Sequence, residues 1–367
     1  MPLTRPVLPN VSLTGLLLLT VLLVGTAHGA AQPVTAVQVD KGSFNPGAGE
    51  SVTLGFRLEQ PAAARIQVYD PDGGLIRTLP VPAGPDGSDQ RVTWDGRDDS
   101  GTAVPDEAYT FVIETTAGAV YDPTTFSGGE VADLTDLTFG DSGTVGYRLP
   151  APARVLIRLG VHNGPMYRTL VDWKPRPAGS VTEQWDGFDQ DQIVKLRGHK
   201  DLSALVTYAT LPEATVIAYG NAAETYRAYK LGRGKDRPVK PERPPAADAT
   251  QRFRPESLVP PAWARAPDVM LSFPDFPAPD AVPTAKRTVA VRIEVAAEDK
   301  PRLMGDQFEV LLFVDSQFFA EAERGYLPLN WTWELTQFPP GEHVLTVNIS
   351  SFRGQVGVAS RKILVEK

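Results

Sequence analysis

The sequence predicts an all-β protein that consists of three β-sandwich domains in tandem, with a Pro-rich linker before the third. Three observations carry this prediction. Short motifs recur at a constant spacing of 91 residues, apolar and polar residues alternate in short segments separated by Gly, Pro and Asp, and no stretch carries a convincing helical stripe. The length of 367 residues suits two or three domains of ordinary size.

The first thirty residues have the features of an export signal. Arg5 is their only charged residue, and it precedes an apolar segment of 12 residues at positions 13–24. A helix that crosses a bilayer needs about 20 residues, so this segment is too short for a permanent anchor. We therefore expect residues 1–30 to be a signal peptide that is cleaved after Gly29 or near Ala31, with an uncleaved amino-terminal anchor as the alternative.

Composition and charge exclude several classes of function. The chain has no Cys, which excludes disulfides, thiolate metal sites, iron–sulfur clusters and a cysteine nucleophile. The net charge is −8, and removal of Arg5 with the leader would make it −9, which disfavours binding to nucleic acid or anionic lipid. Past the leader no segment approaches membrane length, so we expect no membrane insertion after cleavage. An exported chain without Cys fits the envelope of a bacterium, in the periplasm or at the cell surface.

An internal repeat is the most informative feature of the sequence. Three motifs recur with one shift of 91 residues: Gly55-Phe56-Arg57-Leu58 as Gly146-Tyr147-Arg148-Leu149, Arg77-Thr78-Leu79 as Arg168-Thr169-Leu170, and Trp94-Asp95-Gly96 as Trp185-Asp186-Gly187. A constant shift without net insertion indicates the tandem duplication of one folding unit. Each unit has the size of a small β-sandwich.

We place the first unit at residues 31–125 and the second at residues 126–222. The alternation predicts strands in the first unit at residues 52–58, 64–69, 75–79, 91–94 and 109–113. An Asp-Pro-Asp-Gly-Gly turn follows the second of these strands. The second unit repeats the plan, and we expect it to end with strands at 205–208 and 216–219.

The order of these motifs resembles the FlgD-type immunoglobulin-like domain. The motifs are Phe44-Asn45-Pro46, an alternating strand that ends in Leu, the Asp-Pro-Asp-Gly-Gly turn, Arg-Thr-Leu, and a Trp-Asp-Gly-Arg-Asp-Asp-Ser-Gly-Thr-Ala-Val-Pro stretch with a Tyr shortly after. The resemblance covers residues 40–120 and, less well, residues 131–220, where Gln190-Asp191-Gln192-Ile193 replaces the Asp-Ser-Gly-Thr turn. It implies immunoglobulin-like sandwiches, which occur in many exported and surface proteins. It does not imply the hook-capping role for which the family is named, because a Sec-type leader precedes the module.

After the second unit the composition changes. Residues 223–266 are rich in Pro, Lys and Arg, which predicts a semi-rigid spacer or a strap across the neighbouring domain, with a basic docking arm for an acidic partner as the alternative. Residues 267–367 return to strand patterning at 288–295, 308–315, 343–349 and 356–365. We expect a third sandwich there, of a generic bacterial immunoglobulin-like type and distinct from the first two.

Acidic turns are the sharpest candidates for a functional site. They comprise Asp70, Asp72, Asp95, Asp98, Asp99, Asp186, Asp189 and Asp191. Calcium requires several such oxygens to converge, but Asp and Gly are also the residues that hairpin turns favour. Because no EF-hand spacing is present, we expect turns, no metal site and no cofactor.

The remaining candidates are aromatic and imidazole groups. Trp331 and Trp333 share one strand face, and we favour a buried face over a platform for a sugar ring. His162, His199 and His343 have no nucleophile or metal-ligand motif beside them, so we expect no catalytic residue.

These observations predict a non-catalytic exported scaffold that binds protein partners through rigid β surfaces in the periplasm or at the cell surface. Two alternatives remain open. The chain could be an accessory subunit of an extracytoplasmic enzyme or electron-transfer complex, or a carbohydrate-binding module.

Overall fold

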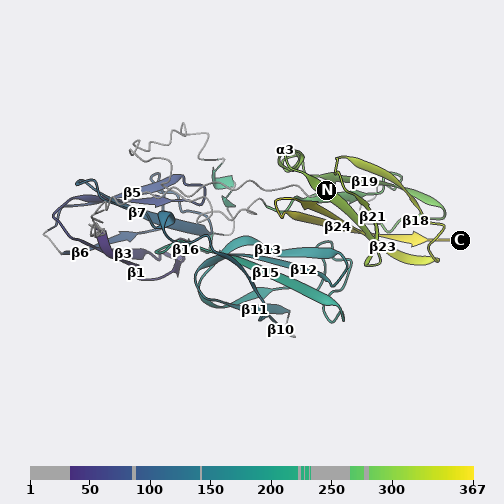
Figure 1. Ribbon diagram of the computed structural model, residues 1–367, viewed down its shortest axis with the longest axis horizontal. Helices are drawn as coiled ribbons and strands as arrows, with labels where there is room; N and C mark the ends of the chain where they lie inside the picture. Colours follow the sequence, from purple (N-terminus) through teal and green to yellow (C-terminus); the bar gives the residue numbers. More distant parts are fainter. Residues whose placement is uncertain are drawn as a thin grey trace, which may run out of the picture. The chain divides into compact units, whose positions relative to one another are not determined.

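The computed structural model describes residues 34–84, 88–140, 143–221, 225–226, 228–230, 232, 265–276 and 281–367. These residues form six sheets, two for each of three immunoglobulin-like sandwiches (Figure 1), which confirms the predicted fold class. The predicted signal peptide, residues 1–30, and most of the predicted linker, residues 223–266, lie outside the described residues. Within the described ranges, no helix has the length and apolarity that a membrane crossing requires.

The first sandwich packs a three-stranded sheet against a six-stranded one. The smaller sheet has the order β1 (Val34–Val39), β3 (Val52–Leu58) and β6 (Ser88–Trp94). The larger sheet has the order β2 (Ser43–Phe44), β16 (Val216–Ala218), β7 (Glu107–Thr115), β4 (Ala64–Tyr69) and β5 (Leu75–Val81), with β8 (Val120–Tyr121) also beside β7. Two 3₁₀ turns, η1 (Pro46–Ala48) and η2 (Pro123–Thr125), follow β2 and β8. The indole of Trp94 fills the centre of this core, against the rings of Phe44, Tyr109 and Phe111.

The second sandwich repeats this plan with its own core. One sheet has the order β10 (Thr138–Gly140), β11 (Thr144–Leu149) and β14 (Gly179–Gln184). The other has the order β13 (Met166–Arg176), β12 (Ala153–Val161), β15 (Leu202–Thr210) and β9 (Val131–Leu134). Val145, Ile157, Trp185 and Val206 are among the residues of this core.

One expected strand lies in a different domain from the one predicted. Residues 216–219 were expected to end the second unit, but β16 lies in the larger sheet of the first unit, between β2 and β7. Figure 1 shows β16 beside β7. It pairs in parallel with β2 and antiparallel with β7. The chain therefore completes the first sandwich only after it has built the second.

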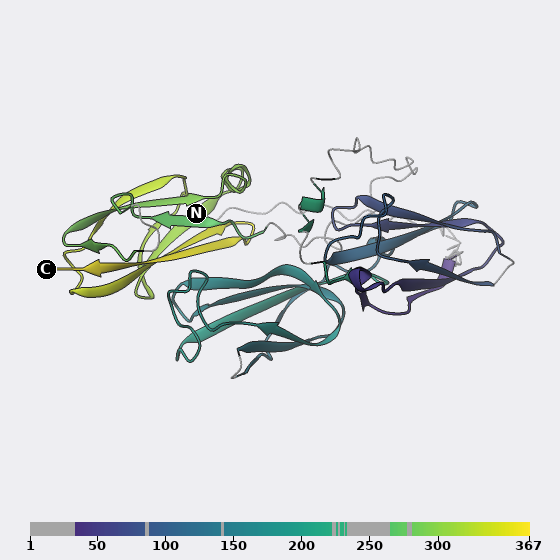
Figure 2. The ribbon, with the colours of Figure 1, turned by 180° about the vertical axis from the view of Figure 1, so that it is seen from behind.

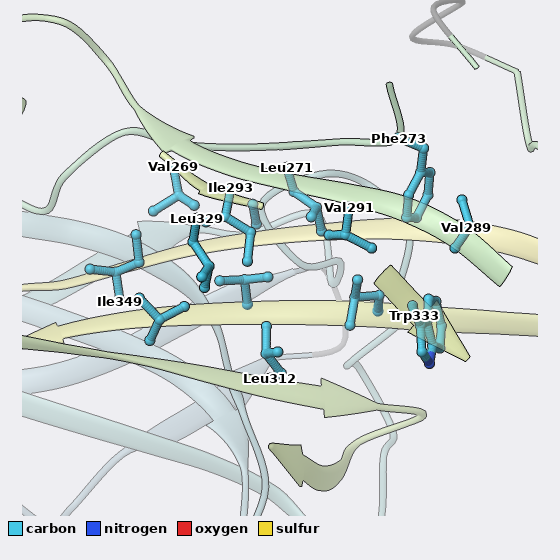
Figure 3. Close-up of a cluster of buried hydrophobic side chains, with 14 of the residues drawn as sticks. Val269, Leu271, Phe273, Val289, Val291, Ile293, Leu312, Leu329, Trp333 and Ile349 are labelled. Atoms are coloured by element: carbon cyan, nitrogen blue, oxygen red, sulfur yellow. The ribbon is translucent and has the colours of Figure 1, made fainter. Parts of the chain in front are cut away.

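The third sandwich packs a three-stranded sheet against a five-stranded one, and Figure 2 shows it from behind. The smaller sheet has the order β17 (Val269–Ser272), β19 (Thr288–Val295) and β22 (Leu329–Glu334). The larger sheet has the order β18 (Thr284–Ala285), β24 (Val356–Val365), β23 (Gly341–Ser351), β20 (Phe308–Val314) and β21 (Gln317–Ala322). A short helix, α3 (Lys300–Met304), links β19 and β20. Alternate residues of both sheets, such as Ile293 and Ile349, point into the core between the layers (Figure 3).

A buried ion pair joins the first and second sandwiches. The Arg154 guanidinium lies 2.8 Å from the Glu107 carboxylate, and the two side chains are only 2% and 8% exposed. Arg154 also donates a hydrogen bond to the Trp173 carbonyl. Burial raises the pKa of Glu107 above its usual value, although the charge of Arg154 opposes this shift. A charge pair this deep holds the junction in one geometry, because neither group can be solvated in place.

We expect Arg154→Met to lower the free energy of unfolding by about 3–5 kcal/mol, because it leaves the Glu107 carboxylate buried without this cation. Urea denaturation followed by Trp fluorescence measures the loss. Arg57→Met is the matched control, since Arg57 pairs with Asp89 at the surface, where the two side chains are 48% and 73% exposed. The control should lose less than about 1 kcal/mol. Equal losses in the two variants would contradict a special role for the buried pair.

Candidate functional site

The Trp-Asp-Gly motifs of the two units build the same loop. The indole Nε1 donates to the carbonyl three residues later in both copies, from Trp94 to Arg97 and from Trp185 to Phe188, at 2.9 Å each. The next Asp, Asp95 in the first copy, accepts from the backbone N–H two residues on, and its counterpart in the second copy does the same. The repeated Arg also has a role, because Arg77 donates to the carbonyl of Asp98. The repeat is therefore structural, and its motifs encode loop geometry.

The second acidic residue of each loop closes a turn. Asp98 Oδ1 accepts from the backbone N–H groups of Ser100 and Thr102 and from the Ser100 hydroxyl, at 2.6–3.0 Å. Asp189 Oδ1 accepts from the N–H groups of Ile193 and Val194 in the same way. The second loop contains one extra residue, but it closes with equivalent contacts. The departure of residues 190–193 from the family pattern therefore changes the loop length and not its construction.

The Asp-Pro-Asp-Gly-Gly turn uses its first acid in the same way. Asp70 Oδ1 accepts from the backbone N–H groups of Asp72 and Gly74, at 3.0 and 2.7 Å. Asp70 is almost completely buried, so its second oxygen also requires a partner.

That partner comes from the start of the predicted linker. The described residues 225, 226 and 228–230, which we call the capping segment, include a short helical stretch that packs on the first unit. Lys230 Nζ lies 2.7 Å from Asp70 Oδ2 and 3.6 Å from Asp72 Oδ2. The Tyr226 hydroxyl donates to Asp72 at 2.8 Å, and the Tyr229 hydroxyl donates to Asp98 at 3.0 Å. Three acids from two loops are thus bound by three side chains of one segment.

Charge and burial act together at this contact. Burial and the Asp70 and Asp72 carboxylates raise the pKa of the Tyr226 phenol, so it remains a hydrogen-bond donor. Burial would raise the pKa of Asp98, but its hydrogen bonds with Ser100, Thr102 and Tyr229 lower it overall. Tyr229 is 3% exposed and belongs to the first hydrophobic core. The capping segment is therefore part of the first sandwich.

The prediction of a spacer missed this contact. The many Pro, Lys and Arg residues that follow dominate the composition of residues 223–266, so the prediction gave no weight to the two Tyr residues. The spacing of Tyr226 and Tyr229, three apart and just before Lys230, is the signal for one helix face that could have revealed it.

The acidic turns bind protein groups, and the described residues contain no cluster of three or more His, Asp or Glu side chains suited to a metal ion. Asp186 is bound by Arg168 and Gln192 as well as by the Phe188 N–H. Those three hydrogen bonds outweigh burial and lower the pKa of Asp186 to about 2. The arrangement favours turn formation over cation binding.

The third domain contacts the corresponding face of the second unit. Asn348 accepts from the Met166 N–H and donates to the Met166 carbonyl, at 2.8 Å each. The Ser360 N–H donates to Asp191 at 2.6 Å, and the Tyr167 hydroxyl contacts the Ser316 hydroxyl. Burial raises the pKa of Asp191. The loop face of each duplicated unit therefore contacts another part of the same chain.

The aromatic and imidazole candidates are structural. Trp333 is fully buried and Trp331 partly buried, stacked at 6.0 Å between ring centroids inside the third domain. His343 is buried between the Asp315 carboxylate and the Pro339 carbonyl. His199 Nδ1 accepts from the Asp201 N–H in a loop. The His162 backbone N–H donates to the Asp201 carbonyl, so His162 and His199 contact the same residue of the second domain, whereas His343 lies in the third domain.

A shallow polar pocket of about 390 Å³ lies over the smaller sheet of the first unit. Two of its charged lining groups, Arg57 and Asp89, form an ion pair at 3.1 Å. Glu59 accepts from the Thr35 hydroxyl. Its lining contains no His.

We expect Lys230→Met to lower the free energy of unfolding by about 1–3 kcal/mol, because it removes the cation beside the buried Asp70 oxygen. Thermal and urea denaturation measure the change. Lys200→Met is the matched control, because Lys200 is 87% exposed, and it should have almost no effect. Calcium should leave the melting temperature of the unmodified chain unchanged, since Asp70, Asp72 and Asp98 are already bound by the capping segment. A rise on calcium addition would contradict this assignment.

We also expect the stability of the third domain to depend on His343. Burial would lower the pKa of His343, but the hydrogen bonds with Pro339 and Asp315 raise it overall. Its contribution is therefore fully present below the ordinary His value of about 6.5 and is lost as the pH rises through the raised value. Asp315→Asn should flatten the decline in stability across this window, measured as melting temperature against pH. Asp306→Asn, which removes an ion pair with Arg353 in the same domain, should leave the decline intact.

Comparison with known proteins gives a family for part of the chain. Residues 43–119 match the family model described as the FlgD Ig-like domain. The basal-body rod modification protein FlgD of Salmonella typhimurium is 32% identical over 92 residues, and that of Salmonella typhi matches equally. The alignment covers 25% of this chain and 39% of each relative. The chain therefore matches about two fifths of the length of these relatives.

Among solved structures, an endo-β-1,4-mannanase from Thermotoga petrophila aligns with 42% of this chain and 27% of its own, at 15% identity and a TM-score of 0.22. A region of a bacterial ice-binding adhesin covers 91% of this chain and 98% of its own, at 14% identity and a TM-score of 0.18. TM-scores and sequence identities this low do not indicate a shared function. Residues 43–119 therefore form an immunoglobulin-like domain that is similar to the FlgD Ig-like domain in both the family match and the motifs above.

Proposed function

We propose that this chain is an exported, non-catalytic scaffold that binds protein partners in the periplasm or at the cell surface of a bacterium. The observation that carries the proposal is the way the duplicated units are fixed. A strand from beyond the second unit completes the first, and a buried ion pair joins the two. Units held in this way present β surfaces in a fixed relation, which a scaffold requires.

The chemistry of the candidate residues supports a role without catalysis. Both carboxylate oxygens of Asp70 and of Asp98 bind protein groups: one oxygen accepts from turn N–H groups, and the other contacts Lys230 or Tyr229. His343 is held between two oxygen acceptors inside the third domain. Residues used in this way stabilise loops, and they are not placed around a common substrate position.

The burial of Trp333 disfavours the carbohydrate-binding alternative. A sugar platform needs an exposed ring face, but Trp333 is 0% exposed, and Trp331 is partly buried and stacks on Trp333. Protein surfaces remain the better ligand. The signal peptide that the sequence predicts at residues 1–30 supports a partner outside the cytoplasm.

Affinity isolation from the native envelope tests this proposal. We expect the full chain, tagged at its carboxyl terminus, to be found in the periplasmic or surface fraction and to retain specific proteins. A chain that lacks residues 1–30 is the matched control, and it should remain in the cytoplasm and retain none of them. Equal distribution of the two chains, or substrate turnover by the purified protein alone, would contradict the proposal. A partner that is an enzyme or carries haem would identify an accessory subunit.

A further inference from the structure

The first unit contains a slot that a distant strand fills. Ile217 and Ala218 of β16 pair in parallel with Ser43 and Phe44 of β2. On its other side, β16 pairs antiparallel with residues 107–109 of β7. Without β16, both neighbours would lose these pairings, and the backbone groups of β7 that bond to it would need other partners.

The side chains of β16 complete the packing on both faces of the sheet. Val216 is 0% exposed and Ala218 is 1% exposed, and both belong to the core of the first sandwich. Ile217 points to the other face, where it packs with Ala108 and Leu211. The exit from the strand is equally close-fitting, because a side chain at Gly220 would lie 2.3 Å from the Asn45 amide.

The capping segment extends the same binding site. We call residues 216–230 the completing segment, because they include β16 and the capping segment. Strand pairing contributes backbone hydrogen bonds, while Tyr226, Tyr229 and Lys230 match the positions of three carboxylates. Peptides that add a strand to a sheet are recognised in this way, with affinity from the backbone and specificity from side-chain contacts.

The second unit needs no such addition. Its β15 pairs directly with β9, a strand from its own beginning, through Val206 with Leu134 and Ala209 with Val131. In the first unit, the corresponding initial strand β2 is separated from β7 by β16. A complete sandwich lies between the first unit and its completing segment in the sequence. The contacts between the slot and the segment therefore do not depend on the chain that connects them, which only holds the segment near the slot.

We propose that the first unit is a receptor for the completing segment and accepts it from a second copy of this chain. Two copies that exchange residues 216–230 form every slot contact of the single chain, so the exchange changes only the connections and not the bonding in the slot. Protein concentration then favours the exchanged dimer. The proposal rests on the strand pairing and side-chain contacts of this segment, and it stands or falls independently of export and of any scaffold partner.

Cysteine pairs test the exchange, because the natural chain has no Cys. Ala108 and Ile217 are directly opposite in antiparallel β7 and β16, at a spacing that a disulfide can bridge. Full chains carrying Ala108→Cys alone and Ile217→Cys alone are unfolded, mixed at high concentration, refolded and oxidised. We expect a disulfide-linked dimer that contains one copy of each variant and separates on reduction. Leu156→Cys and Thr207→Cys, opposite each other within the second unit, are the matched control and should give no such dimer.

A labelled synthetic peptide of residues 212–232 gives an independent readout. We expect the wild-type chain to retain the peptide after refolding in its presence. A chain with both Ala108→Cys and Ile217→Cys should retain it when refolded under reducing conditions, and should lose retention when its own strand has first been locked by oxidation. Failure of the wild-type chain to retain the peptide would overturn the proposal. So would the absence of the mixed dimer while the double variant forms its internal disulfide.

Discussion

The pairing of β16 between β2 and β7 is the constraint on which the rest of the duplicated region depends. Three residues satisfy backbone groups on both sides and place Val216 and Ala218 in the first core. Because the segment arrives from beyond the second unit, the second sandwich must fold as an insertion between parts of the first. The buried pair of Glu107 and Arg154 lies at the same junction, with Glu107 opposite Ala218 in the sheet. The strand and the ion pair therefore stabilise one interface.

The two copies show which features the duplicated sequence encodes locally and which it leaves to the surroundings. The indole bond of Trp94 and that of Trp185 have the same partner position and the same length. Asp98 and Asp189 close equivalent turns but differ in environment. Burial acts to raise the pKa of both carboxyls. At Asp98 the hydrogen bonds, including the one from the Tyr229 hydroxyl, outweigh burial and lower the pKa, whereas at Asp189 burial prevails and the pKa is raised. The shared motifs thus form loops that close with equivalent contacts, while the segment that covers each loop determines its electrostatics.

This distinction also explains how much the sequence could predict. Alternation placed strands such as β3 and β4 correctly, because a strand with one buried face must alternate. The Asp-Gly pairs predicted turns for a similarly local reason. The alternation of residues 216–219 indicated a strand, but no local property states which sheet a three-residue strand joins. The repeat suggested two self-contained units, and the structure differs because β16 and Tyr229 complete the first unit from a distance of more than 100 residues in the sequence.

The acidic loops already bind other parts of the same chain, so an external partner would bind elsewhere. Asp70, Asp72 and Asp98 face the capping segment, and Asp191 faces the third domain. A partner that used these loops would first have to displace buried hydrogen bonds, including that of Tyr229, which costs more than binding to an open surface. Large apolar side chains that remain exposed present no such obstacle, and Phe318 of β21 is 55% exposed on a strand at the edge of its sheet. An edge of this kind offers unpaired backbone groups beside an apolar ring, and both are what an added strand requires. For a scaffold with this fold, the outer edges of the sheets are therefore better suited to partners than the conserved-looking loops that the two units share with each other.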